Sequence, residues 1–344
     1  MSLDRAWLAA LQTQAVPCVL VTVARAEGSV PREAGTKMLV SQHGLSGTIG
    51  TFGTIGGGHL ELRACEIARA MLHTMLRTAP DASPAHYRFP LGPSLGQCCG
   101  GAAELVFEPI SWPRPAWVGE LAALLAQGQG ADLVTPLDTS PPSHGTKTLR
   151  PAPAEPAVAG ACVLQTAPGG ALLIERILPC DLRIMLFGAG HVGSALVGIL
   201  GNLPCEVTWI DAREAQFPAT LPQNVCAEID DAPESHARRA FPGTYFLVMT
   251  HDHALDQAIS EAILRRGDFA WFGLIGSATK RRLFERRLSA RGIAPALLAR
   301  MSCPIGIEGI DGKQPGVIAV AVAAQLLGAH QRLREAALTR HEGA

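Results

Sequence analysis

Short apolar segments alternate with segments of helical periodicity along the second half of the chain. Apolar runs bounded by turn residues predict strands, and apolar positions that recur every three or four residues predict helices. The strands are expected over residues 183–190, 205–211, 244–250 and 269–277. The helices are expected over residues 192–200, 234–241, 256–267, 278–292 and 315–334. Alternating strands and helices require right-handed crossovers, so this half is expected to form a parallel sheet covered on both faces.

The first half follows a less regular pattern. Runs rich in β-branched residues predict strands within residues 16–29, 37–50 and 101–110, and helical spacing predicts helices over 62–77 and 115–128. Such a mixture is typical of an α/β or an α+β domain. The whole chain is therefore expected to be an α/β protein, with an N-terminal α/β domain and a C-terminal Rossmann-like parallel-sheet domain.

Composition changes sharply over residues 138–160, where five prolines interrupt any apolar periodicity. Such a stretch is typical of a loop or an extended linker. Three parts are therefore expected. They are an N-terminal domain over 1–137, a Pro-rich linker and connecting segment over 138–180, and a Rossmann-like domain over 181–344.

The charge balance limits the classes of partner. The 344 residues carry 29 Lys and Arg against 30 Asp and Glu, a balance that argues against a general electrostatic grip on nucleic acid. The N-terminus has no signal-peptide pattern, and the apolar run 316–329 is short for a bilayer, so no membrane is expected. That run is expected to form a buried core helix or, alternatively, a homodimer face. The nine cysteines lack a disulfide-framework spacing, which favours a reduced, cytoplasmic protein.

A glycine-rich turn follows the first strand of the second half. Gly188, Gly190 and Gly193 have the G-x-G-x-x-G spacing, and Asp211 ends the next strand about 20 residues later. In this pattern Gly188 makes the turn, Gly190 lets backbone amides approach a phosphate, and Gly193 lets the helix pack closely on the strand. The pattern predicts either an NAD(P) site or a frame that keeps its glycines for packing.

Two neighbouring side chains qualify the nucleotide prediction. His191 lies within the glycine turn, where its ring would narrow a phosphate site. Arg213 follows Asp211 by two residues and is either a contact for a 2′-phosphate or a solvated surface arginine.

Polar residues also follow the next two strands, at the edge where open α/β sheets bind ligands. His251, Asp252, His253 and Asp256 follow one strand, and Ser277 follows the other. The first group is suited to a metal or to proton transfer, or simply to capping the next helix. Ser277 and the adjacent amides are suited to an anionic group.

Three consecutive glycines precede a predicted helix in the first half. Gly56, Gly57 and Gly58 would form either a nest of amides for a phosphate or a tight turn that requires positive φ.

Adjacent thiols occur before another glycine pair, in the order Cys98, Cys99, Gly100 and Gly101. Neighbouring residues of a strand point apart, and structural zinc sites prefer C-x₂-C spacing, so a standard zinc site is not expected. The pair is either one thiolate in a glycine-rich loop, suited to a metal with affinity for sulfur, or two small buried residues.

These segments together resemble the XdhC/CoxI family, the accessory proteins of bacterial molybdenum hydroxylases. The resemblance runs through the whole chain and keeps the family's order of motifs. Two positions depart from it, since His59 stands where one branch carries Cys and Gly316 stands where an acidic residue is common. The motifs are EGSVPREAGTKMLV, GTIGGGHLE, LGQCCGG, FGAGHVG, DARE, THDHALD, LIGSATKRR and CPIGIEGIDGKQPGVIAVAVAAQLL.

The resemblance implies a carrier of molybdenum cofactor rather than an enzyme. Such a protein would protect the cofactor while a cysteine desulfurase installs its terminal sulfido ligand. It would then deliver the cofactor to apo xanthine dehydrogenase or a related molybdenum hydroxylase. Proteins of molybdenum cofactor biosynthesis are further partners that the resemblance implies.

The resemblance also suggests roles for the residues already named. Cys98 or Cys99 would meet molybdenum, and one of the two glycine-rich turns would hold the phosphate of the molybdopterin. The full set of expected cofactor-binding residues is Cys98, Cys99, Gly100, Gly101, Gly56, Gly57, Gly58, Gly188, Gly190, His191, Gly193, Asp211, His251 and Ser277.

Two enzyme functions are the alternatives. One is an NAD(P)-dependent oxidoreductase with Cys98 and Cys99 as a redox pair and His251 or His253 as the acid or base. The other is a metal-dependent hydrolase built around residues 251–253.

Overall fold

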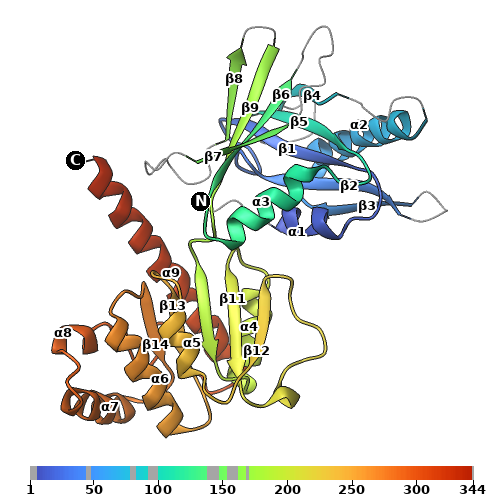
Figure 1. Ribbon diagram of the computed structural model, residues 1–344. Helices are drawn as coiled ribbons and strands as arrows, with labels where there is room; N and C mark the ends of the chain where they lie inside the picture. Colours follow the sequence, from blue (N-terminus) through green and yellow to red (C-terminus); the bar gives the residue numbers. More distant parts are fainter. Residues whose placement is uncertain are drawn as a thin grey trace. The chain divides into compact units, whose positions relative to one another are not determined.

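The structure is a computed structural model that describes residues 6–43, 48–77, 83–91, 100–137, 147–152, 162–167 and 170–342 (Figure 1). The chain forms two compact units, Met1–Pro179 and Cys180–Ala344. Each unit has its own sheets and its own buried core.

A five-stranded antiparallel sheet forms the centre of the first unit, with the order β3-β2-β1-β5-β4. The β-branched run of β1 places it in the middle, paired with β2 on one side and with β5 on the other. The strands are β1 (Cys18–Glu27), β2 (Lys37–His43), β3 (Thr48–Gly53), β4 (Ala85–Pro90) and β5 (Ala102–Ile110). The helices are α1 (Ala6–Thr13), α2 (Gly58–Arg77) and α3 (Ala116–Ala126).

Successive residues of β1 face opposite sides of this sheet, as the period of a strand requires. Val19 and Val21 lie in a core cluster with the buried face of α2. Leu20 lies in a different cluster with Trp7 of α1 and Trp117 of α3. The sheet is therefore covered on both faces by helices from its own unit.

A second antiparallel sheet corrects the expected domain boundaries. Its order is β7-β6-β9-β8, and its strands are β6 (Ala131–Leu137), β7 (Thr148–Pro151), β8 (Cys162–Ala167) and β9 (Gly170–Ile177). Three of these strands lie within the segment 138–180, for which the composition predicts a linker. That prediction is wrong for the described parts of the segment, because β7 and β9 pair with β6, β8 pairs with β9, and all of them belong to the first unit. The boundary falls between Pro179 and Cys180, and the antiparallel sheets make this half α+β.

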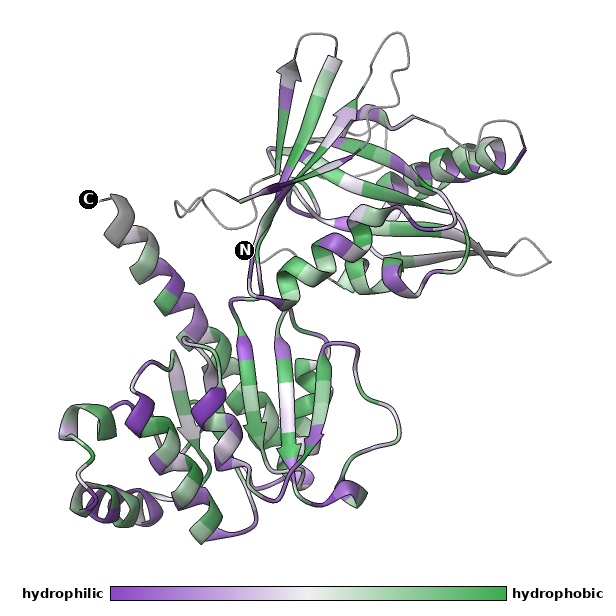
Figure 2. Cartoon of the chain, viewed as in Figure 1, coloured by the Kyte–Doolittle hydropathy of each residue, from purple (hydrophilic) through white to green (hydrophobic). Residues whose placement is uncertain are grey.

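The second unit is a doubly covered parallel sheet with the order β12-β11-β10-β13-β14-β15, which confirms the Rossmann-like prediction. Its strands are β10 (Arg183–Phe187), β11 (Glu206–Asp211), β12 (Val225–Ile229), β13 (Tyr245–Val248), β14 (Trp271–Leu274) and β15 (Met301–Ser302). Its helices are α4 (His191–Leu200), η2 (Glu214–Gln216), α5 (Glu234–Arg239), α6 (His253–Arg266), α7 (Ala278–Ala290), α8 (Pro295–Leu298) and α9 (Pro315–Glu342). The strands consist mainly of hydrophobic residues, whereas α7 carries many polar residues (Figure 2).

Two core clusters cover the two faces of this sheet. Helices α4 and α9 contribute to one cluster, and α5, α6 and α7 contribute to the other. Helix α9 includes the apolar run 316–329 and extends well beyond it. By length and composition alone its residues Pro315–Ala337 would suffice to cross a membrane, a test that core helices of soluble proteins also pass. Because Ala319, Val322 and Leu326 are buried against the sheet, we assign α9 as a core helix.

Candidate functional site

The carboxyl ends of the parallel strands in the second unit bring the predicted polar segments to one edge. The turns after β10, β13 and β14 carry the glycine motif, the His-Asp-His segment and Ser277, and Asp211 ends β11. The sheet places β10 between β11 and β13, so these turns are neighbours. This edge is the first candidate site.

The glycine turn has the conformation that its spacing predicts. Gly188 has φ of 112°, and a Cβ there would lie 2.4 Å from the Met249 carbonyl oxygen. A Cβ on Gly193 would lie 2.2 Å from the Gly188 carbonyl oxygen, so α4 packs closely on the turn. The structural roles of these two glycines are confirmed. A Cβ on Gly190 would meet no described atom within 4 Å, so this position leaves room for a ligand, and its binding role stays a prediction.

The carboxylate of Asp211 is engaged within the protein. Its Oδ1 accepts hydrogen bonds from the backbone N and the Nε of Arg213, both at 2.9 Å. Its Oδ2 accepts from the Ala189 amide at 2.7 Å and from Arg213 Nη2 at 2.8 Å. Burial alone would raise the pKa of Asp211, but these donors outweigh it and hold the pKa at about 2. Arg213 is therefore the ion-pair partner of Asp211, while its side chain is 38% exposed, and its role toward a 2′-phosphate stays a prediction.

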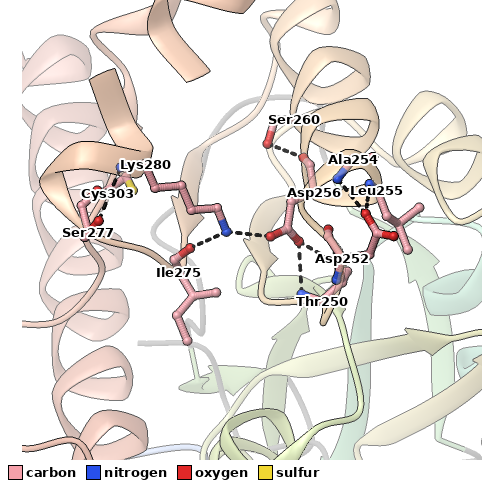
Figure 3. A network of polar contacts seen from close by, with 10 residues as sticks. All are labelled: Thr250, Asp252, Ala254, Leu255, Asp256, Ser260, Ile275, Ser277, Lys280 and Cys303. Carbon is pink, nitrogen blue, oxygen red and sulfur yellow. Dashed lines mark hydrogen bonds and ion pairs between the residues drawn. The ribbon is translucent and has the colours of Figure 1, made fainter. Parts of the chain in front are cut away.

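An ion pair joins α6 to α7, the helices that follow β13 and β14 (Figure 3). Lys280 Nζ lies 2.6 Å from Asp256 Oδ2 and also donates to the Ile275 carbonyl at 2.9 Å. Asp256 is fully buried, and its Oδ1 accepts from the backbone N and the Oγ1 of Thr250. A Cβ on Gly276 would lie 2.6 Å from Lys280 Cδ, so the lysine passes over this glycine. Both oxygens of Asp256 are thus engaged within the protein, where the residue links α6 to Thr250 and to Lys280.

The residues flanking this pair act mainly as helix caps. Asp252 accepts from the Ala254 and Leu255 amides, which confirms the capping alternative at the start of α6. Ser277 accepts from the Lys280 amide and caps α7. His251 and His253 are exposed beside these caps. Among the described residues no group of three or more His, Cys, Asp or Glu side chains could hold a metal ion.

Three motif loops of the first unit form the second candidate site. The glycine turn at 56–58 and the pair Gly100-Gly101 both contact the segment 27–31. A Cβ on Gly56 would lie 2.3 Å from Pro31 Cβ. A Cβ on Gly101 would lie 2.3 Å from the Glu27 carbonyl oxygen and 2.6 Å from that of Ser29. The Leu91 amide donates to the Gly101 carbonyl at 2.8 Å, so described residues on the two sides of positions 92–99 are hydrogen-bonded to each other. Gly100 is exposed. Cys98 and Cys99 lie outside the described residues.

The glycine nest of this unit contains a carboxylate from its own chain. Gly56, Gly57 and Gly58 have φ of 122°, 73° and 64°, so the positive-φ turn is confirmed. Glu61 Oε2 accepts from the Ile55 amide at 3.0 Å and from the Gly57 amide at 3.1 Å. The Thr54 hydroxyl donates to the same oxygen at 2.5 Å. A phosphate at these amides would have to displace Glu61.

We expect Glu61→Ala to lower the free energy of unfolding by about 1–2 kcal/mol, because two backbone amides and a hydroxyl lose their acceptor. Inorganic phosphate is expected to restore part of that loss in the variant, since vacated nests bind anions. Chemical denaturation with and without phosphate measures both effects.

Glu66→Ala on the same helix is the matched control, because its ion pair with Arg63 is exposed and should contribute less than about 1 kcal/mol. Equal stabilisation of the wild type and Glu61→Ala by phosphate would show that Glu61 does not occupy the nest.

The described cysteines do not offer a substitute for the thiol pair. Burial raises the pKa of Cys18, Cys162 and Cys205 to about 12, so these thiols stay protonated at neutral pH. Of the seven cysteines that the structure describes, Cys226 alone is exposed.

Two family models match parts of the chain, one in each unit. Residues 184–326 match the XdhC Rossmann domain, and residues 11–78 match the XdhC and CoxI family.

Relatives of known name are similar over different shares of the chain. A Bacillus subtilis protein named as a probable subunit of xanthine dehydrogenase is 25% identical over 328 residues, which cover 92% of this chain and 94% of that protein. The uncharacterized protein YqeB of Escherichia coli is 31% identical over 153 residues, or 42% of this chain, and the match spans 27% of YqeB. A crystal structure described as a xanthine dehydrogenase from Bacillus halodurans superposes with a TM-score of 0.68 at 22% identity, covering 96% of both chains. The last similarity shows a shared fold over both units.

Proposed function

The chain belongs to the XdhC and CoxI family, and from this premise we propose that it is an accessory protein of a molybdenum hydroxylase rather than an enzyme. It binds molybdenum cofactor as cargo and shields it while a cysteine desulfurase installs the sulfido ligand. It then transfers the cofactor to apo xanthine dehydrogenase or a related hydroxylase in the cytoplasm. Proteins that synthesise the cofactor are the expected donors.

The observation that carries this proposal is the convergence of the motif loops in the first unit. Gly56 contacts Pro31, and Gly101, which follows the Cys98–Cys99 pair, contacts the backbone of Glu27 and Ser29, so both glycine motifs lie against the same segment 27–31. A thiolate of this pair suits molybdenum, which has a high affinity for sulfur. The Bacillus subtilis relative, whose name refers to xanthine dehydrogenase, aligns over nearly the whole chain, which supports a partner of that class.

The two glycine turns differ in what they offer the phosphate of the cargo. Glu61 accepts from the Ile55 and Gly57 amides in the first unit. At Gly190 a Cβ would meet no described atom within 4 Å, and α4 begins there without a side-chain cap among the described residues. A helix N-terminus attracts phosphate through its unpaired amides and its dipole. The amides of the second turn are therefore open to an anion, whereas those of the first turn already bind Glu61.

A retention experiment tests the proposal. The purified protein is incubated anaerobically with released molybdenum cofactor and desalted, and molybdenum and pterin are quantified. The wild type is expected to retain both, and Cys98→Ala or Cys99→Ala is expected to lose most of the molybdenum. Cys226→Ala is the matched control, because its thiol is exposed but belongs to the second unit. A wild type that retains neither molybdenum nor pterin would overturn the carrier function.

A further inference from the structure

The acidic residue at the end of β11 has no acceptor position left for a ligand. A carboxylate offers about four lone-pair sites to hydrogen-bond donors. In Asp211 all four are used, two by donors on Oδ1 and two by donors on Oδ2. Three of these donors belong to Arg213 and the fourth is the Ala189 amide.

This arrangement conflicts with the ligand that the fold is known to accept. In dinucleotide-binding Rossmann domains, the acidic residue at this position receives the hydroxyl groups of a ribose. The other parts of such a site are present, because Gly188 and Gly193 shape the turn and a Cβ on Gly190 would meet no described atom. The carboxylate that would bind the ribose, that of Asp211, is the part already engaged, by Arg213 and the Ala189 amide.

A ribose would have to displace a stronger donor than itself. The contact between the Arg213 side chain and Asp211 is bidentate and charge-assisted, and the Asp211 side chain is only 5% exposed. A ribose hydroxyl would also make a charge-assisted hydrogen bond to the carboxylate, but it carries no positive charge. Its binding therefore has to break the two-bond ion pair with Arg213, and this cost opposes it.

We propose that Arg213 is a specificity-determining residue that blocks a latent nucleotide site in the second unit, so that nucleosides and dinucleotides are excluded. The guanidinium occupies the position of the ribose hydroxyls. The inference concerns ligand exclusion at Asp211 and stands independently of cofactor transfer by the first unit.

Titration with NADH, NADPH and ADP-ribose tests the block by calorimetry and by NADH fluorescence. The wild type is expected to bind none of the three. Arg213→Ala is expected to bind NADH and ADP-ribose saturably, because the vacated Asp211 carboxylate accepts the ribose hydroxyls. Its Kd is expected to lie about tenfold below the lower limit that the wild-type titration sets. Arg213→Met, which keeps the bulk of the side chain without its donors, is titrated in parallel so that a folding defect in one variant is recognised.

Two control variants test whether the gain in nucleotide affinity depends on the Asp211 carboxylate. Arg238→Ala removes an exposed arginine of the same unit, one that lies 3.9 Å from Glu234, and should gain no binding. Asp211→Asn combined with Arg213→Ala should lose the binding gained by the single variant.

Saturable binding of NADH or NADPH to the wild type would overturn the inference. So would folded Arg213→Ala and Arg213→Met variants that gain no affinity. Neither outcome bears on the retention of molybdenum and pterin, so the two proposals fail separately.

Discussion

Replacing Lys37 by Met is expected to lower the free energy of unfolding of the first unit by about 3–5 kcal/mol, because the buried Glu175 carboxylate loses its hydrogen-bonded cation and keeps Lys147, 4.0 Å away, as its ion-pair partner. Lys37 Nζ forms an ion pair with Glu175 and donates to Thr22 Oγ1 at 2.7 Å. The two charged side chains are 1% and 0% exposed. Urea denaturation of the full chain, followed by circular dichroism, measures the change.

A double variant separates loss of the pair from loss of the charge balance. Lys37→Met with Glu175→Leu should recover most of the stability, since a buried ion pair can often be replaced by apolar side chains of similar volume. Arg63→Met, which removes an exposed pair with Glu66, should cost less than about 1 kcal/mol. A double variant no more stable than Lys37→Met would argue against the loss of the hydrogen-bonded cation at Glu175 as the cause.

The second large effect is expected at the glycine turn of the second unit. Gly188→Ala should lower the free energy of unfolding by about 2–4 kcal/mol, from backbone strain together with a clash against Met249. The residue combines φ of 112° with a Cβ position only 2.4 Å from a carbonyl oxygen. Thermal and urea denaturation measure the loss.

Gly190→Ala is the matched control two residues later. Its φ is −77° and a Cβ there meets no described atom within 4 Å, so a change of no more than about 1 kcal/mol is expected. Similar losses at the two positions would show that the turn as a whole, rather than the Gly188 conformation, sets the stability.

The fold of the second unit was largely predictable because its strands are buried on both faces and therefore read as apolar runs. The predictions missed β12, whose residues are mostly half-buried or exposed, and β15, which has only two residues. In the first unit α1, β4 and all four strands of the second sheet, β6, β7, β8 and β9, were missed. The strands of that sheet pair across Pro-rich segments, and local periodicity does not report such pairing.

The sequence predicted where the residues of the candidate sites lie, but it did not predict which side chains they contact. The spacing located Asp211 and the glycine turn correctly, yet it left two roles open for Arg213 and did not give the bidentate contact. Asp256 and Lys280 are 24 residues apart and meet because β13 and β14 are adjacent. The role of Glu61 had a usable signal, since an acidic residue in the first turn of a helix readily reaches back to the preceding amides.

The ion pairs of the first unit determine which fragments of this protein can be studied alone. Lys37 and Glu108 lie on the five-stranded sheet, and their partners Glu175 and Lys147 come from the segment that follows Leu137. A fragment ending at Leu137 would leave both charges without these partners. A fragment ending at Pro179 keeps both pairs and all nine strands of the unit that the structure describes. Truncation for biophysical work should therefore follow Pro179, beyond the Pro-rich stretch where composition alone would place the cut.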